Sequence, residues 1–129
     1  MSSSSTARDT SAARVISSTA AAGLFQLAET TRARSCPWPC LSRTTTGGKE
    51  ALRILAINPG PAAALAKRFA YVGYKGGSEP GVVSMTVLVR DKQDRARVVS
   101  ASWNNPAAAV DEMTLAALVS RAVELLDKP

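Results

Sequence analysis

Residues 71–82 read YVGYKGGSEPGV, and this stretch sets the expected fold for the second half of the 129-residue chain. Residues 69–74 alternate between two faces, as a β-strand does, before the composition changes to glycine. Pro80 and Gly81 end the segment, and the valine-rich residues 82–89 follow as a second strand. Because the connection is short, the two strands are predicted to be antiparallel neighbours.

The rest of the second half adds a strand and a helix. A polar turn at residues 90–95 leads into a third predicted strand at residues 97–103, so residues 69–103 are expected to form an antiparallel sheet. A C-terminal helix is predicted over residues 106–127, opened by Asn104-Asn105-Pro106. Its apolar stripe has helical spacing and is expected to cover one face of the sheet: Leu115, Leu118, Val119, Ala122, Val123 and Leu126.

The first half of the chain is predicted to be mainly helical over residues 7–68. Thr6 and Asp9 fit a capping box, and apolar residues then recur at helical spacing, which favours a helix over residues 7–33. That stripe consists of Ile16, Ala20, Leu24 and Leu27. The expected class is α+β, with N-terminal helices followed by a three-stranded antiparallel sheet that a C-terminal helix covers.

Three shorter segments complete residues 7–68. Prolines, threonines and a glycine pair oppose regular structure over residues 34–48, which are predicted to be a loop. Residues 49–57 and 62–68 are predicted to be short helices, separated by Asn58-Pro59-Gly60-Pro61.

Composition indicates one domain and restricts the partners. The chain is 46% hydrophobic with 5% aromatic residues, and it carries a net charge of +6 with a pI of about 9.9. The basic residues are scattered, which favours a solvated basic surface and no nucleic-acid partner. The first residues contain no apolar signal segment, and no apolar run reaches the length of a membrane span. The chain as written is therefore expected to be cytoplasmic, with no membrane span.

No metal site or cofactor is predicted. The two cysteines lie in Cys36-Pro37-Trp38-Pro39-Cys40, and the chain has no histidine and no second cysteine pair to complete a zinc site. A disulfide between them and a pair of free thiols are both compatible with this spacing.

The candidate functional site is Lys75, Gly76, Gly77 and Ser78. The lysine places a compact positive charge at the end of a strand, and the glycines let a ligand approach the strand edge closely. This pattern suits a substrate that has a carboxylate and an extended, amide-like body, which can pair with the strand edge.

Lys75-Gly76-Gly77 resembles the Lys-Thr/Ser-Gly (KTG) element of penicillin-binding proteins and class A β-lactamases. The following two strands and terminal helix have the order in which that family ends, and residues 6–10, TARDT, resemble a helix start of the family. The resemblance implies an incomplete β-lactamase-like fold. It also implies hydrolysis of β-lactams or D-alanyl peptides through an acyl-serine, in a family that is usually extracytoplasmic.

The resemblance also implies roles for the site residues. Lys75 would orient the substrate carboxylate, Gly77 would leave room for the acyl group, and the Ser78 N–H would serve the oxyanion hole. Gly76 departs from the family, because a hydroxyl residue usually stands there.

The sequence contains neither Ser-x-x-Lys nor Ser-Asp-Asn, and no looser Ser-x-Asn is assigned to the site. Thr46-Gly47-Gly48-Lys49 has a hydroxyl and a lysine at the first spacing, but it falls in the predicted loop and is not assigned. The chain is therefore expected to be a C-terminal fragment without a catalytic residue, inactive alone, whose open strand edge favours association. The alternative is a small non-catalytic protein that binds peptides at the glycine-rich edge.

Overall fold

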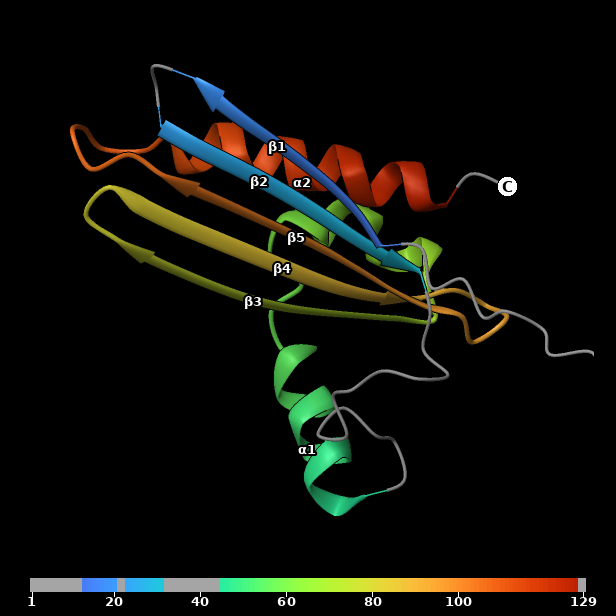
Figure 1. The fold of residues 1–129 in the computed structure, drawn as a ribbon. Coiled ribbons are helices and arrows are strands. Elements are labelled where there is room, and N and C mark those ends of the chain that lie inside the picture. Colours follow the sequence, from blue (N-terminus) through green and yellow to red (C-terminus); the bar gives the residue numbers. More distant parts are fainter. Residues whose placement is uncertain (1–12, 21–22, 32–44, 128–129) are drawn as a thin grey trace, which may run out of the picture.

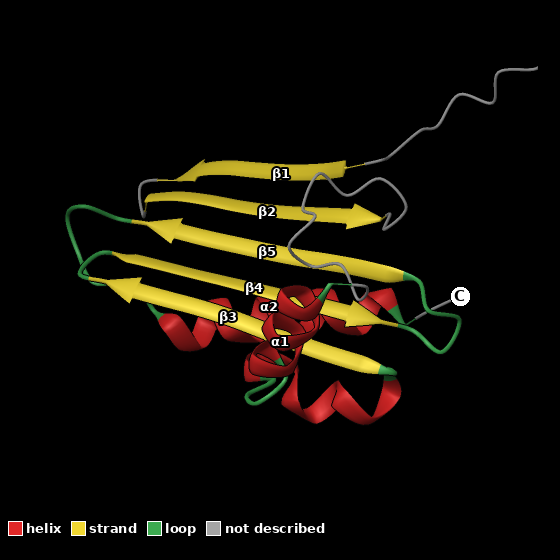
Figure 2. Cartoon of the chain, turned by 90° about the horizontal axis from the view of Figure 1, so that it is seen from below, coloured by secondary structure: helices red, strands yellow, loops and turns green. Residues whose placement is uncertain are grey.

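The computed structural model describes residues 13–20, 23–31 and 45–127. The protein is α+β, and its strands form one antiparallel sheet in the order β1-β2-β5-β4-β3 (Figures 1 and 2). In chain order the elements are β1 (Ala13–Ala20), β2 (Gly23–Thr31), α1 (Thr46–Leu55), the 3₁₀ helix η2 (Gly60–Arg68), β3 (Tyr71–Glu79), β4 (Val82–Arg90), β5 (Ala96–Asn104) and α2 (Glu112–Leu126). The Cys36–Cys40 segment and the proposed capping box at Thr6 lie outside the described residues.

The predicted three-stranded antiparallel sheet and C-terminal helix are confirmed as β3, β4, β5 and α2. The β3–β4 hairpin turns at Pro80-Gly81, with Glu79 opposite Val82. Gly81 has a φ of +76°, and a Cβ atom there would lie 2.5 Å from the carbonyl oxygen of Asn105. Proline followed by a glycine of positive φ is the sequence that a type II turn requires, so this pair fixes the register of β3 on β4.

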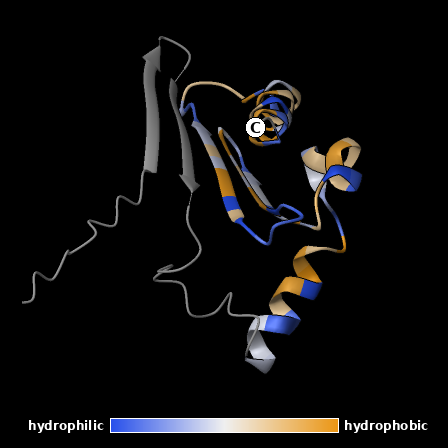
Figure 3. Ribbon diagram, turned by 90° about the vertical axis from the view of Figure 1, so that its right-hand side faces the viewer, coloured by the Kyte–Doolittle hydropathy of each residue, from blue (hydrophilic) through white to orange (hydrophobic). Residues whose placement is uncertain are grey.

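The core lies between β4 and α2. Every second residue of β4 is buried on the face that α2 covers, because side chains alternate along a strand: Val83, Met85, Val87 and Val89. Four residues of the predicted helical stripe meet them: Leu115, Val119, Val123 and Leu126. Figure 3 shows α2 and η2 on the same side of β3–β5. Leu118 belonged to the predicted stripe but is 39% exposed.

The prediction of a helix over residues 7–33 is wrong for residues 13–20 and 23–31, which form β1 and β2. Eight residues of β2, from Leu24 to Thr31, pair with β5, so the backbone of β5 is hydrogen-bonded on both sides. The segment also contains the β-branched residues Val15, Ile16 and Thr19, which favour strands. The helical spacing of its apolar residues is therefore outweighed by pairing with a distant part of the chain.

Two helix boundaries also differ from prediction. α1 begins at Thr46 inside the predicted loop, because the hydroxyl of Thr45 accepts a hydrogen bond from the N–H of Gly48 at 3.1 Å. α2 begins at Glu112, not at residue 106, because the Asp111 carboxylate caps the helix. Its Oδ1 atom accepts hydrogen bonds from the N–H groups of Met113 and Thr114 at 3.0 and 3.1 Å.

Within the described ranges, none of the helices is both long and apolar enough to cross a membrane.

Replacing Leu115 by alanine is expected to lower the free energy of unfolding by about 2–5 kcal/mol, because its side chain is 1% exposed within the core. The matched control is Leu125→Ala on the same helix, where the side chain is 51% exposed and the change should stay within about 0.5 kcal/mol. Urea denaturation followed by circular dichroism measures both. Equal losses from the two variants would contradict the placement of α2.

Acid is expected to weaken the start of α2 through Asp111. Hydrogen bonds from the Thr114 hydroxyl and backbone N–H, and from the Met113 N–H, hold the pKa of this carboxyl below its usual 3.8, against a smaller opposing effect of burial. The stabilisation is therefore present above the ordinary pKa of the carboxyl and is lost as the pH falls through the lowered pKa.

Asp111→Asn should accordingly reduce stability at pH 7 and flatten its decline below pH 4, as measured by thermal unfolding at a series of pH values. Glu79→Gln removes one negative charge from an exposed site in the β3–β4 hairpin and is the charge-matched control. An acid transition identical in Asp111→Asn and the wild type would show that the charge of the Asp111 carboxylate does not contribute to the pH dependence.

Candidate functional site

The candidate site lies on β3, which is an edge strand that pairs with β4 alone among the described strands. The N–H of Asn105 donates to the carbonyl oxygen of Gly81 at 2.7 Å, so the residues before and after Val82 are hydrogen-bonded to β5. Because the backbone groups of successive residues point alternately to the two sides of a strand, Val82 itself is hydrogen-bonded to β3. By the same alternation, Gly77 and Glu79 direct their backbone groups toward β4. The N–H and C=O groups of Ser78, Gly76 and Tyr74 point to the free edge.

Lys75 is exposed, and its ammonium group lies at that free edge. Its Nζ atom donates a hydrogen bond to the carbonyl oxygen of Gly76, which is one of the outward-pointing groups. On the neighbouring strand β4, Thr86 lies directly opposite Lys75 on the same face of the sheet. The hydroxyl of Thr86 shares a hydrogen bond of 2.8 Å with the hydroxyl of Ser100. The positive charge is therefore at the strand edge, and the sheet face next to it is lined with hydroxyl groups.

A groove of about 270 Å³ runs along the end of β3. It is lined by residues of β3, β4 and the first turn of α2: Tyr74, Gly76, Gly77, Ser78, Val83, Ser84, Met85 and Glu112. Three of the four predicted site residues line it, and Lys75 reaches the same edge through Gly76. The structure thus brings the four predicted residues to one place, where a small acyl or carboxylate ligand would meet backbone donors and one cation.

Tyr74 lines this groove but is not among the predicted site residues. Its ring lies between two glycines, and a Cβ atom at Gly60 or at Gly76 would come 2.5 Å or 2.7 Å, respectively, from a ring carbon. Burial raises the pKa of the Tyr74 hydroxyl, and the negative charge of Glu112 raises it further. The sequence signal that could have identified Tyr74 is its i, i+2 spacing from Gly76, which puts both residues on one face of the strand.

Glycine at position 76 has a physical cause in this packing. The hydroxyl oxygen of Tyr74 overlaps the space that a side chain at position 76 would fill. Gly77 is different, because a Cβ atom there would meet no atom within 4 Å. Glycine at position 76 is thus required by a neighbouring ring, whereas glycine at position 77 leaves open space at the groove.

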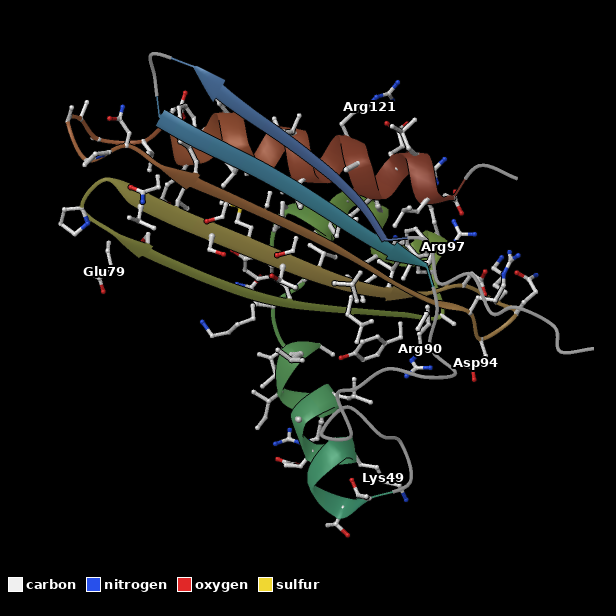
Figure 4. The ribbon with its side chains drawn as sticks, in the orientation of Figure 1. Lys49, Glu79, Arg90, Asp94, Arg97 and Arg121 are labelled. Atoms are coloured by element: carbon white, nitrogen blue, oxygen red, sulfur yellow. The ribbon has the colours of Figure 1, made fainter. Side chains whose placement is uncertain are left out.

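The other sequence motifs that could carry catalytic groups lie away from the groove. Thr46 and Lys49 lie on the first turn of α1, and Figure 4 shows Lys49 at the end of this helix that is remote from the sheet. Ser102-Trp103-Asn104 has a Ser-x-Asn spacing, but Ser102 pairs with Ser84, which in turn pairs with Gly77, so roughly 10 Å of sheet separate it from the edge strand. Among the described residues, no group of three or more histidine, cysteine, aspartate or glutamate side chains could hold a metal ion.

No family model, curated protein or solved structure matches this chain.

The two glycines are expected to respond oppositely to alanine. Gly76→Ala should lower the free energy of unfolding by about 1–3 kcal/mol, because the new methyl group overlaps the Tyr74 ring. Gly77→Ala should raise it by about 0.4–1 kcal/mol, because the site is open and the unfolded chain loses conformational freedom. Chemical denaturation of both variants measures the difference, and a destabilised Gly77→Ala with an unaffected Gly76→Ala would overturn the assigned packing.

Proposed function

We propose that this chain carries the substrate-binding strand edge of a β-lactamase-like, penicillin-recognising serine hydrolase and is inactive alone. The observation that supports this proposal is the convergence at the free edge of β3 of the Lys75 ammonium and the outward-pointing backbone groups of Gly76 and Ser78. A β-lactam or D-alanyl peptide has the complementary groups, namely an anionic carboxylate and a carbonyl next to an extended amide.

In this proposal the substrate lies along the edge of β3 like an added strand. Lys75 leaves the carbonyl of Gly76 and pairs with the substrate carboxylate, as a flexible exposed lysine can do. Gly77 leaves space for the acyl group. The outward N–H of Ser78 is placed to donate to the carbonyl oxygen, which becomes negative when a nucleophile attacks it.

The chemical step requires groups that this sequence does not provide. The chain contains no Ser-x-x-Lys and no histidine, so the Ser78 hydroxyl has no base of the usual kinds beside it in sequence. Pre-set donors without an activated nucleophile bind a substrate but do not cleave it. The proposal therefore assigns recognition to this chain and predicts no turnover.

The alternative is a non-catalytic peptide-binding protein, and the outer edge of β3, which no described strand pairs with, favours it equally. The two proposals differ in what the ligand must contain. Strand addition needs only backbone groups, so an extended peptide with an amidated C-terminus would bind as well as the free acid. The hydrolase proposal requires the carboxylate, because Lys75 is its partner. Self-association through the same edge would make the apparent affinity depend on protein concentration.

The test is titration of the pure chain with benzylpenicillin, followed by NMR or calorimetry, together with an assay for hydrolysis of a chromogenic cephalosporin. Binding without turnover is expected, and Lys75→Ala should weaken it about fivefold at low salt, since exposed ion pairs contribute up to about 1 kcal/mol. Lys67→Ala, on the exposed side of η2, is the matched control and should leave affinity unchanged.

Two results would reject the proposal. Catalytic turnover that Lys75→Ala abolishes would show that the chain is a complete enzyme. Failure of benzylpenicillin to bind, with binding of an amidated extended peptide, would favour the non-catalytic alternative.

A further inference from the structure

We infer that the Tyr74 hydroxyl donates a hydrogen bond to the substrate and so determines specificity at this edge. The hydroxyl occupies the space that a side chain at position 76 would fill. This inference rests on the proposed function. It names the group that binds the second oxygen of the substrate carboxylate, whose first oxygen meets Lys75.

The geometry brings the two groups together at Gly76. From one face of β3, the Lys75 ammonium reaches the Gly76 carbonyl at the free edge. From the other face, the phenol of Tyr74 lies over the same glycine and lines the groove. A carboxylate seated beside Gly76 therefore meets a cation on one side and a hydroxyl donor on the other, which is the arrangement that gives strong, charge-assisted hydrogen bonds.

The ring of Tyr74 is held in position. Gly60 is in the left-handed conformation, with a φ of +55°. Because Gly60 has no side chain, the Tyr74 ring packs against it, and Gly76 lies near the hydroxyl end of the same ring. A donor that is fixed before the ligand arrives loses little conformational entropy on binding. Among residues 45–127, the hydroxyl of Tyr74 takes part in no hydrogen bond, so its proton is available to a ligand.

The charges around the hydroxyl determine which ligand atom it meets. Burial and the nearby Glu112 both raise its pKa, so the phenol stays protonated and acts as a donor at neutral pH. Glu112 lies at the α2 side of the groove and repels an anion. The carboxylate is therefore expected at the Gly76 side of the phenol, where Lys75 offsets the charge, with Ser78 next along the strand.

The experiment measures benzylpenicillin affinity for four variants of the full chain. Tyr74→Phe keeps the ring and removes the donor, and it should weaken binding about tenfold without changing the midpoint of thermal unfolding. Tyr71→Phe is the matched control, because that hydroxyl donates to the Leu52 carbonyl at 2.7 Å and lies on the other face of β3. It should lower stability and leave affinity unchanged.

Rescue separates a donor role from a merely structural one. Tyr74→Ala should bind weakly, and the double variant Tyr74→Ala, Gly76→Thr should regain most of the affinity, because removal of the ring opens the space in which the threonine hydroxyl replaces the phenol.

The outcomes separate the two proposals. A loss of benzylpenicillin affinity in Tyr74→Phe, and its recovery in the double variant, would support the inference. Unchanged affinity in Tyr74→Phe, together with weakened binding in Lys75→Ala, would overturn the role of Tyr74 and leave the proposed function standing. Absence of benzylpenicillin binding to the wild type would overturn both.

Discussion

The packing of β4 against α2 is the contact on which the rest of this structure depends. β4 is hydrogen-bonded on both sides, and its inward face is buried by the apolar stripe of α2. Because side chains on a strand alternate strictly, burial of Val83 and Val87 fixes which residues of β3 and β5 share their face. A shift of one residue would place the polar residues Ser84 and Thr86 in the core, so the register is strongly determined.

That register in turn sets the chemistry of the edge. With Glu79 opposite Val82, the backbone groups of Gly76 and Ser78 have no strand to bond to among the described residues and face outward. Lys75 and Tyr74 then fall on opposite faces of β3 and both reach Gly76. The packing of β4 therefore brings together a cation, a phenol and two outward backbone donors, although β4 itself contributes few of the polar groups in the groove.

The second half of the fold could be predicted from the sequence because several local signals agree there. The β-branched run of β4, the Pro80-Gly81 turn and the apolar stripe of α2 each favour the same arrangement. β1 and β2 could not be predicted in this way. Their apolar residues fit a helical period, and what makes them strands is the pairing of β2 with β5, more than sixty residues away in the chain, and of β1 with β2.

The candidate site was predictable to a similar extent. Lys75, Gly76, Gly77 and Ser78 are adjacent in sequence, so they lie together in any strand, but the position of that strand at the edge of the sheet follows from the fold. The reason for glycine at position 76 was not predictable, because it depends on a ring that Gly60 holds in place from the other side. The start of α2 shows the same limit, since Asn105 and Asp111 are both good capping residues and only the packing of α2 on β4 selects Asp111.

The outward N–H groups of β3 have no strand partner among the described residues, and in the proposed function they meet the ligand. Residue-resolved amide hydrogen exchange tests this arrangement. Protection is expected to alternate along β3, with Gly77 and Glu79 exchanging slowly and Gly76 and Ser78 exchanging fast, and saturating benzylpenicillin is expected to slow the exchange of Ser78. Uniform protection from Gly76 to Glu79 in the free protein would refute the alternation, and a Ser78 amide that benzylpenicillin leaves unchanged would refute its part in binding.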